Sequence, residues 1–199
     1  TQEEYILLVQ NQSDDCELAM IKVDGEIIAA NEHDGKYYVN KKYLTESVNV
    51  EAIANNKLST VSINSSEANL EKQISNVTIP DDVNYITVKV VAEDGTSKQY
   101  TIVVNKLSNN TNLQASITMD ENGQEVTKQV AFDDNKQATI KVGNNESVSI
   151  TGILEDSLAE ISINESLPEK GQTTQTVVTT EEKTSIIIKV DAQDGTQGN

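Results

Sequence analysis

The chain has 199 residues with 32 acidic and 15 basic side chains, which gives a net charge of −17 and a pI near 4.3. This charge argues against binding to nucleic acid, whose phosphates attract Lys and Arg, and against binding to an anionic membrane surface. Aromatic residues make up 4% of the chain and Trp is absent, so a core must consist mostly of Ile, Val and Leu, which suits a β-sandwich.

The chain has one cysteine, Cys16, so no disulfide can form within it. No apolar run approaches the roughly 20 residues that span a bilayer. No signal peptide is visible and the first residue is not Met, so we expect a fragment of a longer protein that carries no membrane span of its own.

The first nine residues resemble a strand that occurs again later in the chain. Residues 1–9, TQEEYILLV, match residues 96–104, TSKQYTIVV, with Thr, Tyr and Val at the same places. We therefore predict that residues 1–9 are the last strand of an upstream repeat.

Residues 14–106 predict a first β-sandwich repeat. Apolar and polar side chains alternate over residues 86–92 and again over residues 100–104, as expected for strands with one buried face. Asp24-Gly25 and Asp94-Gly95 have the composition of hairpin turns. About seven such strands with regular turns are typical of a sandwich. Residues 70–74, LEKQI, could form a helical turn, but we predict a strand because the matching stretch at 170–178 is rich in Thr and Val.

Residues 110–199 repeat the pattern at a shift of about 100 positions. Residues 89–96 and 189–196 share Lys, Val, Ala, Asp, Gly and Thr in the same order. Aligning Ile21 with Ile117 places four additional residues in the first hairpin of the second repeat. The chain stops at Asn199, where the last strand should begin, so we expect the second repeat to lack that strand.

The segment VKVVAEDGTSKQYTIVVNK, residues 88–106, resembles the closing pattern of the cadherin-like β-sandwich domain of bacterial surface proteins. That pattern is a strand, then A-E-D-G-T, then Y-T-I-x-V. The second repeat follows it as far as Thr196, with Gln193 in place of Glu. The resemblance implies an all-β fold of tandem immunoglobulin-like (cadherin-like) β-sandwiches in a secreted or wall-attached protein. It implies no catalytic residues and no dependable calcium binding.

Several polar residues are candidates for a metal or catalytic site. The carboxylates that could bind calcium between domains are Asp14, Asp15, Glu93 and Asp94, but no D-x-D-x-D-G loop is present and Asp94-Gly95 is explained as a turn. His33 is the only histidine, and one His without Cys neighbours makes neither a zinc site nor a catalytic pair. We therefore predict no catalytic residue, no metal site and no cofactor, with calcium as the open alternative.

A cysteine and a group of tyrosines are two further candidates. Cys16 lies in a polar linker without a neighbouring base, and we interpret it as incidental. Tyr37, Tyr38 and Tyr43 could stack on a sugar, but the second repeat has no aromatic residue at the matching positions, which favours packing at the core or at an edge.

The additional strand predicted at residues 1–9 and the strand expected to be missing from the second repeat suggest how copies could assemble. An edge strand over Ile186–Ala192 without its neighbour would recruit a matching strand, and residues 5–9 have the required pattern. One alternative is that the sequence starts and stops one strand away from the repeat boundaries. The other is that residues 1–9 add to the first sandwich. The residues predicted to take part in strand complementation are Tyr5, Ile6, Leu7, Leu8, Val9, Ile186, Ile188 and Val190.

These patterns predict a non-enzymatic structural or adhesive module of a Gram-positive surface protein, which acts as a spacer or assembly unit. Head-to-tail strand complementation into a filament is one of the alternatives left open above. Its partners would be neighbouring repeats or copies of itself, with a cell-wall or host glycan or protein as a further possibility, and its location would be the cell wall. The alternative is a carbohydrate-binding or accessory module of a wall-associated enzyme, against which the low aromatic content argues.

Overall fold

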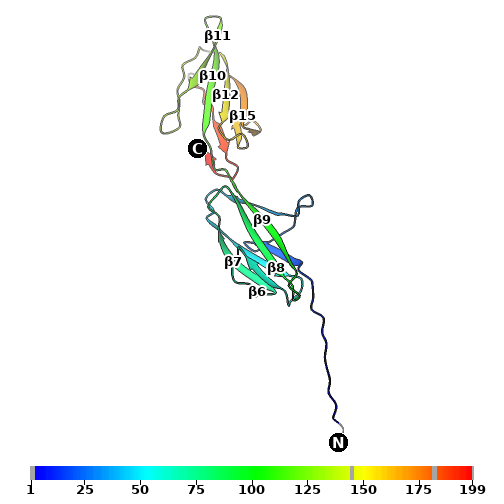
Figure 1. The fold of residues 1–199 in the computed structure, drawn as a ribbon. Coiled ribbons are helices and arrows are strands. Elements are labelled where there is room, and N and C mark those ends of the chain that lie inside the picture. Colours follow the sequence, from blue (N-terminus) through cyan, green and yellow to red (C-terminus); the bar gives the residue numbers. More distant parts are fainter. Residues whose placement is uncertain (1–2, 144–145, 181–182, 199) are drawn as a thin grey trace. The chain divides into compact units, whose positions relative to one another are not determined.

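The computed structural model describes residues 3–143, 146–180 and 183–198, and the secondary structure of these residues consists of strands without a helix. None of them therefore forms a helix that could cross a membrane. The chain divides into two compact units, Thr1–Lys106 and Leu107–Asn199, each of which contains two packed sheets (Figure 1). The all-β prediction is confirmed, and residues 70–74 contribute to strands rather than to a helical turn.

The first unit is a sandwich of a four-stranded and a five-stranded sheet. The four-stranded sheet has the order β2-β1-β4-β7 and contains β1 (Leu18–Val23), β2 (Glu26–Ile28), β4 (Ser47–Ala54) and β7 (Lys72–Thr78). The five-stranded sheet has the order β3-β9-β8-β5-β6 and contains β3 (Tyr37–Lys42), β5 (Thr60–Ile63), β6 (Asn69–Leu70), β8 (Val83–Val91) and β9 (Ser97–Leu107).

The core of the first unit follows from alternation along each strand, because every second side chain points between the sheets. The inward row of β8 is buried while its outward row is exposed or half-buried. The two sheets together bury one continuous cluster of 16 side chains, most of them Ile and Val. The aliphatic composition noted above thus suffices for a complete core.

Strand β9 completes this core. It pairs with β8 over nine residue pairs, from Val83↔Asn105 to Val91↔Ser97. Its inward side chains Tyr100, Ile102 and Val104 are 8%, 0% and 0% exposed. The first half of β8 has β9 as its paired neighbour, since β5 pairs only with residues 88–91.

The second unit repeats the strand order of the first, except that none of its described residues forms a counterpart of β3. One sheet has the order β11-β10-β12-β15 and contains β10 (Leu113–Glu121), β11 (Gln124–Val130), β12 (Ser147–Leu154) and β15 (Gln172–Val178). The other has the order β14-β13-β16-β17 and contains β13 (Glu160–Ile163), β14 (Glu169–Lys170), β16 (Ile188–Asp191) and β17 (Gln197–Gly198).

The alignment of the first strands was wrong. Val23 lies opposite Val50, and Ile117 lies opposite Ile150, so Val23 and not Ile21 is the counterpart of Ile117. A bulge after Leu18 adds a residue to β1, which a comparison by apolar spacing cannot detect. The additional residues of the second unit lengthen both strands of the β10–β11 hairpin, whose ladder has seven pairs against three in β1–β2.

The edge strand predicted over Ile186–Ala192 is also shorter than expected. The structure assigns only Ile188–Asp191 to β16, and β17 pairs with just two of its residues, Val190 and Asp191. The counterpart of residues 184–187 in the first unit is held in a ladder by β9. Without that neighbour in residues 183–198, no ladder forms there, and the strand begins later.

The core of the second unit is divided. Its described residues form two buried clusters of five and four side chains instead of one. Ile186 and Ile188 are half-buried, whereas their counterparts Ile86 and Val88 are 1% and 0% exposed. The described residues of the second sandwich therefore bury their interior less completely than those of the first.

Candidate functional site

The segment Ala92–Thr96, which occurs again in similar form at residues 192–196, forms a tight loop between β8 and β9. The Thr96 carbonyl accepts a hydrogen bond from the Ala92 amide at 2.8 Å, and the Ala92 carbonyl accepts one from the Gly95 amide at 3.1 Å. Gly95 has φ of +90°, which favours Gly, while the Asp94 carboxylate accepts bonds from the Thr96 amide and hydroxyl at 2.8 and 3.0 Å. Each residue type in this stretch thus has a local structural role.

The same loop holds the segment through which the chain enters the first sandwich, residues 13–17, which we call the first lead-in segment. The Asp94 amide donates to the Ser13 carbonyl at 3.3 Å, and the Ser13 amide donates to Glu93 Oε2 at 3.3 Å. Deeper in, the buried hydroxyl of Ser59 donates to the Asp15 carbonyl at 2.7 Å. The loop and the lead-in segment are about 80 residues apart in sequence, so the loop closes the sandwich at this end.

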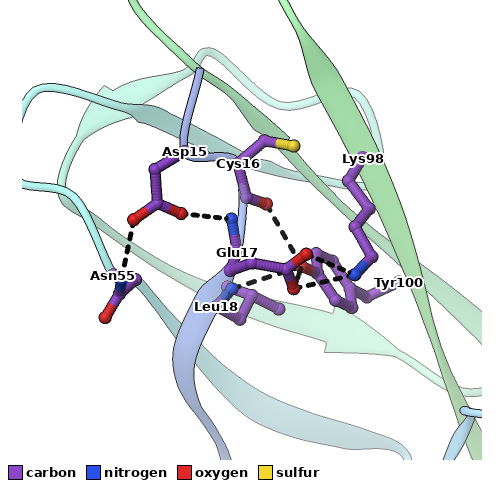
Figure 2. A network of polar contacts seen from close by, with 7 residues as sticks. All are labelled: Asp15, Cys16, Glu17, Leu18, Asn55, Lys98 and Tyr100. Atoms are coloured by element: carbon purple, nitrogen blue, oxygen red, sulfur yellow. Dashed lines mark hydrogen bonds and ion pairs between the residues drawn. The ribbon is translucent and has the colours of Figure 1, made fainter. Parts of the chain in front are cut away.

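Tyr100 is the centre of this contact (Figure 2). Its hydroxyl lies 3.1 Å from the Cys16 carbonyl and 2.8 Å from Glu17 Oε2, and it accepts a bond from the Leu18 amide at 3.2 Å. The Lys98 ammonium lies 2.7 Å from both carboxylate oxygens of Glu17 and 5.1 Å from the Tyr100 ring centre. Two residues of β9 therefore fix the start of β1.

The electrostatics of this network follow from its hydrogen bonds. The bond from Lys98 lowers the pKa of the Glu17 carboxyl below its ordinary value, and the bond from Tyr100 adds to that effect. Burial raises the pKa of the Tyr100 hydroxyl to about 12, assisted by its bond to the Glu17 carboxylate. Tyr100 thus remains a neutral donor over the whole physiological range.

The second unit fastens its own lead-in segment, residues 108–112, by the same backbone pattern. The Asp194 amide donates to the Ser108 carbonyl at 3.1 Å, and the Asn110 amide donates to the Ser108 hydroxyl at 3.1 Å. The Asn112 amide donates to Asn110 Oδ1 at 2.8 Å, and the Glu155 amide donates to the Asn112 carbonyl at 3.1 Å. Both sandwiches are therefore entered through the same type of contact.

The side chains that hold the lead-in segment differ between the two units in which partner is the carboxylate and which is the amide. In the first unit the Asp15 carboxylate accepts from the Asn55 amide group at 2.6 Å. In the second, the carboxylate of Glu155 accepts from the amide groups of Asn110 and Asn112 at 3.0 and 2.7 Å. Both units therefore contain an amide–carboxylate hydrogen bond. The lead-in segment supplies the carboxylate in the first unit and the amides in the second.

The calcium candidates lie near one another but act as hydrogen-bond acceptors. Both oxygens of Asp15 accept bonds, from the Glu17 amide and from Asn55, and Asp94 and Glu93 accept the bonds described above. Asp14 is exposed. In the parts of the chain that the structure describes, no group of three or more His, Cys, Asp and Glu side chains is arranged to hold a metal ion.

The remaining singled-out residues have ordinary positions. His33 is exposed in the loop between β2 and β3, where its amide donates to Asn31. Cys16 is half-buried and packs against the first core. Tyr37 packs edge-on against Tyr100, with ring centres 6.4 Å apart, while Tyr38 and Tyr43 are 43% and 42% exposed.

The predicted strand-complementation residues fall into two groups. Tyr5, Ile6, Leu7, Leu8 and Val9 are 80–89% exposed and belong to no strand. Ile186, Ile188 and Val190 face the interior of the second sandwich next to the short β17. The sequence reasoning missed the roles of Glu17, Asn55, Lys98 and Glu155. The repeated Ser-x-Asp/Asn spacing at residues 13–15 and 108–110 marks the two lead-in segments but not their distant partners.

Two units with similar strand orders, each fastened at its lead-in segment, define a tandem β-sandwich protein. Residues 21–107 match the family model described as cadherin-like beta sandwich domain. The predicted family resemblance and fold class are confirmed for these residues. No curated protein and no solved structure matches the chain significantly.

Proposed function

We propose that this chain is a non-enzymatic structural module of a bacterial surface protein, in which sandwiches joined in series act as spacers or assembly units. The observation that carries the proposal is the path of the chain through the first unit. The lead-in segment is held at the Ala92–Thr96 loop, where β9 begins, and the chain leaves at the far end of β9. At about 3.3 Å per residue, the eleven residues of β9 separate the two points by roughly 35 Å.

This path supports a load-bearing role. A module whose chain enters at one end and leaves at the other transmits tension along its length. The contacts of the lead-in segment with Glu93, Asp94 and Tyr100 resist its removal from that end. The residues that carry the family resemblance thus stabilise the fold, which fits a structural module that catalyses no reaction.

The location and partners belong to the same proposal. A single cysteine, an acidic surface and a cadherin-like sandwich fit the cell wall of a Gram-positive bacterium. The partners are neighbouring repeats or further copies, and assembly proceeds head to tail, so that each copy completes a sheet of the next and a filament grows. Nucleic acid is not a partner, because the net charge of −17 repels it.

Stretching single molecules of the 199-residue chain from its ends tests the proposal. Residues 13–107 should unfold in one discrete event that lengthens the chain by roughly 300 Å, since an extended chain spans about 3.5 Å per residue. Glu17→Gln and Tyr100→Phe should lower the force of that event, whereas Tyr38→Phe should not. Extension of this unit without a force peak, or specific binding of purified wall glycans by the relaxed chain, would refute the structural role.

A further inference from the structure

The outer edge of strand β15 is open. β15 (Gln172–Val178) is the last strand of its sheet, and among the described residues it pairs with β12 on one side and with no strand on the other (Figure 1). The first unit has the same open edge, because β7 ends the corresponding sheet there although β9 is in place. The open edge is therefore a property of the sandwich itself.

The composition of β15 does not protect this edge. Natural sheets usually protect an edge strand with charged side chains or Pro. In the first unit, β7 begins with Lys72, and Pro80 follows it closely. Residues 172–180, QTTQTVVTT, contain no charge and no Pro, although the chain has a net charge of −17. High β propensity without charge favours pairing between copies of one strand, and two acidic chains can approach most closely at a neutral edge.

We propose that β15 pairs antiparallel with β15 of a second copy of this chain about a two-fold axis. The Thr179 amide donates to the Glu146 carbonyl at 2.9 Å, and the Leu154 amide donates to the Gly171 carbonyl at 2.7 Å. The odd-numbered residues of this segment therefore bond toward β12. The residues whose backbone groups point to the open edge are the even-numbered ones, all of them exposed: Gln172, Thr174, Thr176 and Val178.

The register follows from these edge-facing groups. An axis at Gln175 pairs Thr174 with Thr176 of the second copy, and Gln172 with Val178 of the second copy. Both pairs consist of even-numbered residues, so each exchanges two backbone hydrogen bonds. A shift by one residue would turn the inward side chains of one copy to the outer face of the other. The axis at Gln175 keeps the faces aligned and uses the whole of β15.

Gln175 gains a hydrogen-bond partner on this axis. It lies opposite the buried Ile150 on the inward face, and its side-chain oxygen Oε1 is buried without a hydrogen-bond partner in the parts of the chain that the structure describes. A buried oxygen without a donor destabilises the fold. The axis places the two Gln175 side chains in a non-hydrogen-bonded pair, where opposite side chains are closest. Each amide nitrogen can then donate to the oxygen of the other copy.

The outer face of the sheet also continues across this contact. Three pairs of hydroxyl groups already connect neighbouring strands on that face, at 2.8–3.1 Å: Thr118 with Thr127, Ser149 with Thr176, and Thr151 with Thr174. The register places Thr174 beside Thr176 of the second copy, so the hydroxyl rows of the two sheets join. The corresponding face of the first unit carries charges instead, at Lys22, Glu51 and Lys72.

The contact is closed. A two-fold axis uses the same surface on both copies, so the association stops at two chains. It joins modules side by side, whereas the head-to-tail assembly proposed above extends them. The inference goes beyond the proposed spacer role and does not depend on it.

Light scattering of two oppositely charged variants of the full chain tests the proposal. Thr174→Lys combined with Thr176→Lys places like charges opposite each other, which should weaken association by about tenfold or more. Thr174→Glu combined with Thr176→Glu should have the same effect. An equimolar mixture of the two variants should associate again into pairs, because every Lys then lies opposite a Glu.

The matched control carries Thr127→Lys and Gln129→Lys. It adds the same charge to the same face of the sheet, but on the opposite edge strand β11, where both side chains are exposed. This control should associate as the native chain does.

Oxidation of cysteine variants tests the register. In a chain with Cys16→Ser, Gln175→Cys brings two thiols together on the axis, and mild oxidation should give a covalent dimer. Gln172→Cys lies opposite Val178 of the second copy, far from the other introduced thiol, and should give little product.

A native chain that is monomeric at every concentration would overturn the proposal. So would a mixture of the Lys and Glu variants that does not associate, a β11 control that is weakened as much as the β15 variants, or equal yields from the two cysteine variants. The stretching experiment concerns single molecules and the first unit, so the spacer role and the β15 contact can fail independently.

Discussion

Replacing Tyr100 by Phe removes one hydroxyl from the contact that closes the first sandwich. The ring keeps its place in the core and against Tyr37, so the change isolates the polar interactions. The hydroxyl contacts the Cys16 carbonyl, the Leu18 amide and Glu17, and a typical hydrogen bond contributes about 1 kcal/mol. Glu17 is exposed and keeps Lys98, so its share is small. We expect a loss of about 2 kcal/mol in the free energy of unfolding.

Urea unfolding of the full chain, followed by far-UV circular dichroism, measures this loss in the transition of the first unit. The same change should speed hydrogen exchange at the Leu18 amide by about 30-fold, since 1.4 kcal/mol corresponds to a factor of ten. Tyr38→Phe is the matched control, because its hydroxyl makes one exposed bond to Asp34 and should cost less than about 0.5 kcal/mol. Equal effects of the two substitutions would show that Tyr100 does not fasten the lead-in segment.

Three further predictions concern the core, the loop and the pH dependence. Ile86→Ala should cost about 2–5 kcal/mol in the first unit, whereas Ile186→Ala should cost about half as much or less because its site is only half-buried, and unfolding by urea compares them. Gly95→Ala should destabilise the first unit by about 1 kcal/mol through its φ of +90°, although a Cβ there meets no atom; an unchanged midpoint would contradict this. The pKa of Glu17 is lowered on folding, so its contribution is full above pH 4.5 and is lost as the pH falls through the lower folded value. The urea midpoint should therefore fall in acid by less in Glu17→Gln than in the native chain, and equal falls would refute the role of this carboxylate.

The repeat, the all-β fold and the loop at Asp94-Gly95 could be predicted because each depends on local sequence. Alternation and turn composition act over a few residues, and a repeated motif shows itself directly. The partners of the lead-in segment could not be predicted in this way, since Glu17 and Lys98 are 81 residues apart and carry no local pattern. A comparison of the two repeats does not predict the pairing of Asp15 with Asn55 either, because the amide and the carboxylate occupy the opposite positions in the second unit.

Two errors in strand position have separate causes. The register of β1 depends on a bulge, and the position of a bulge is set by contacts with β4 rather than by the apolar pattern of β1 itself. The length of β16 depends on its neighbour, because residues 184–187 have the composition of a strand but no ladder to join. Composition thus predicted which residues favour a strand, while pairing decided which of them form one.

The central claim is that the last strand completes each sandwich, and hydrogen exchange of the full chain at a concentration where it is monomeric tests this most directly. Peptides that cover residues 84–87 should be strongly protected by β9, whereas those that cover residues 184–187 should exchange much faster. Appending residues 100–106 after Asn199 should restore protection at 184–187 and leave 84–87 unchanged. Equal protection of both stretches in the native chain, or no gain in the appended variant, would contradict the account.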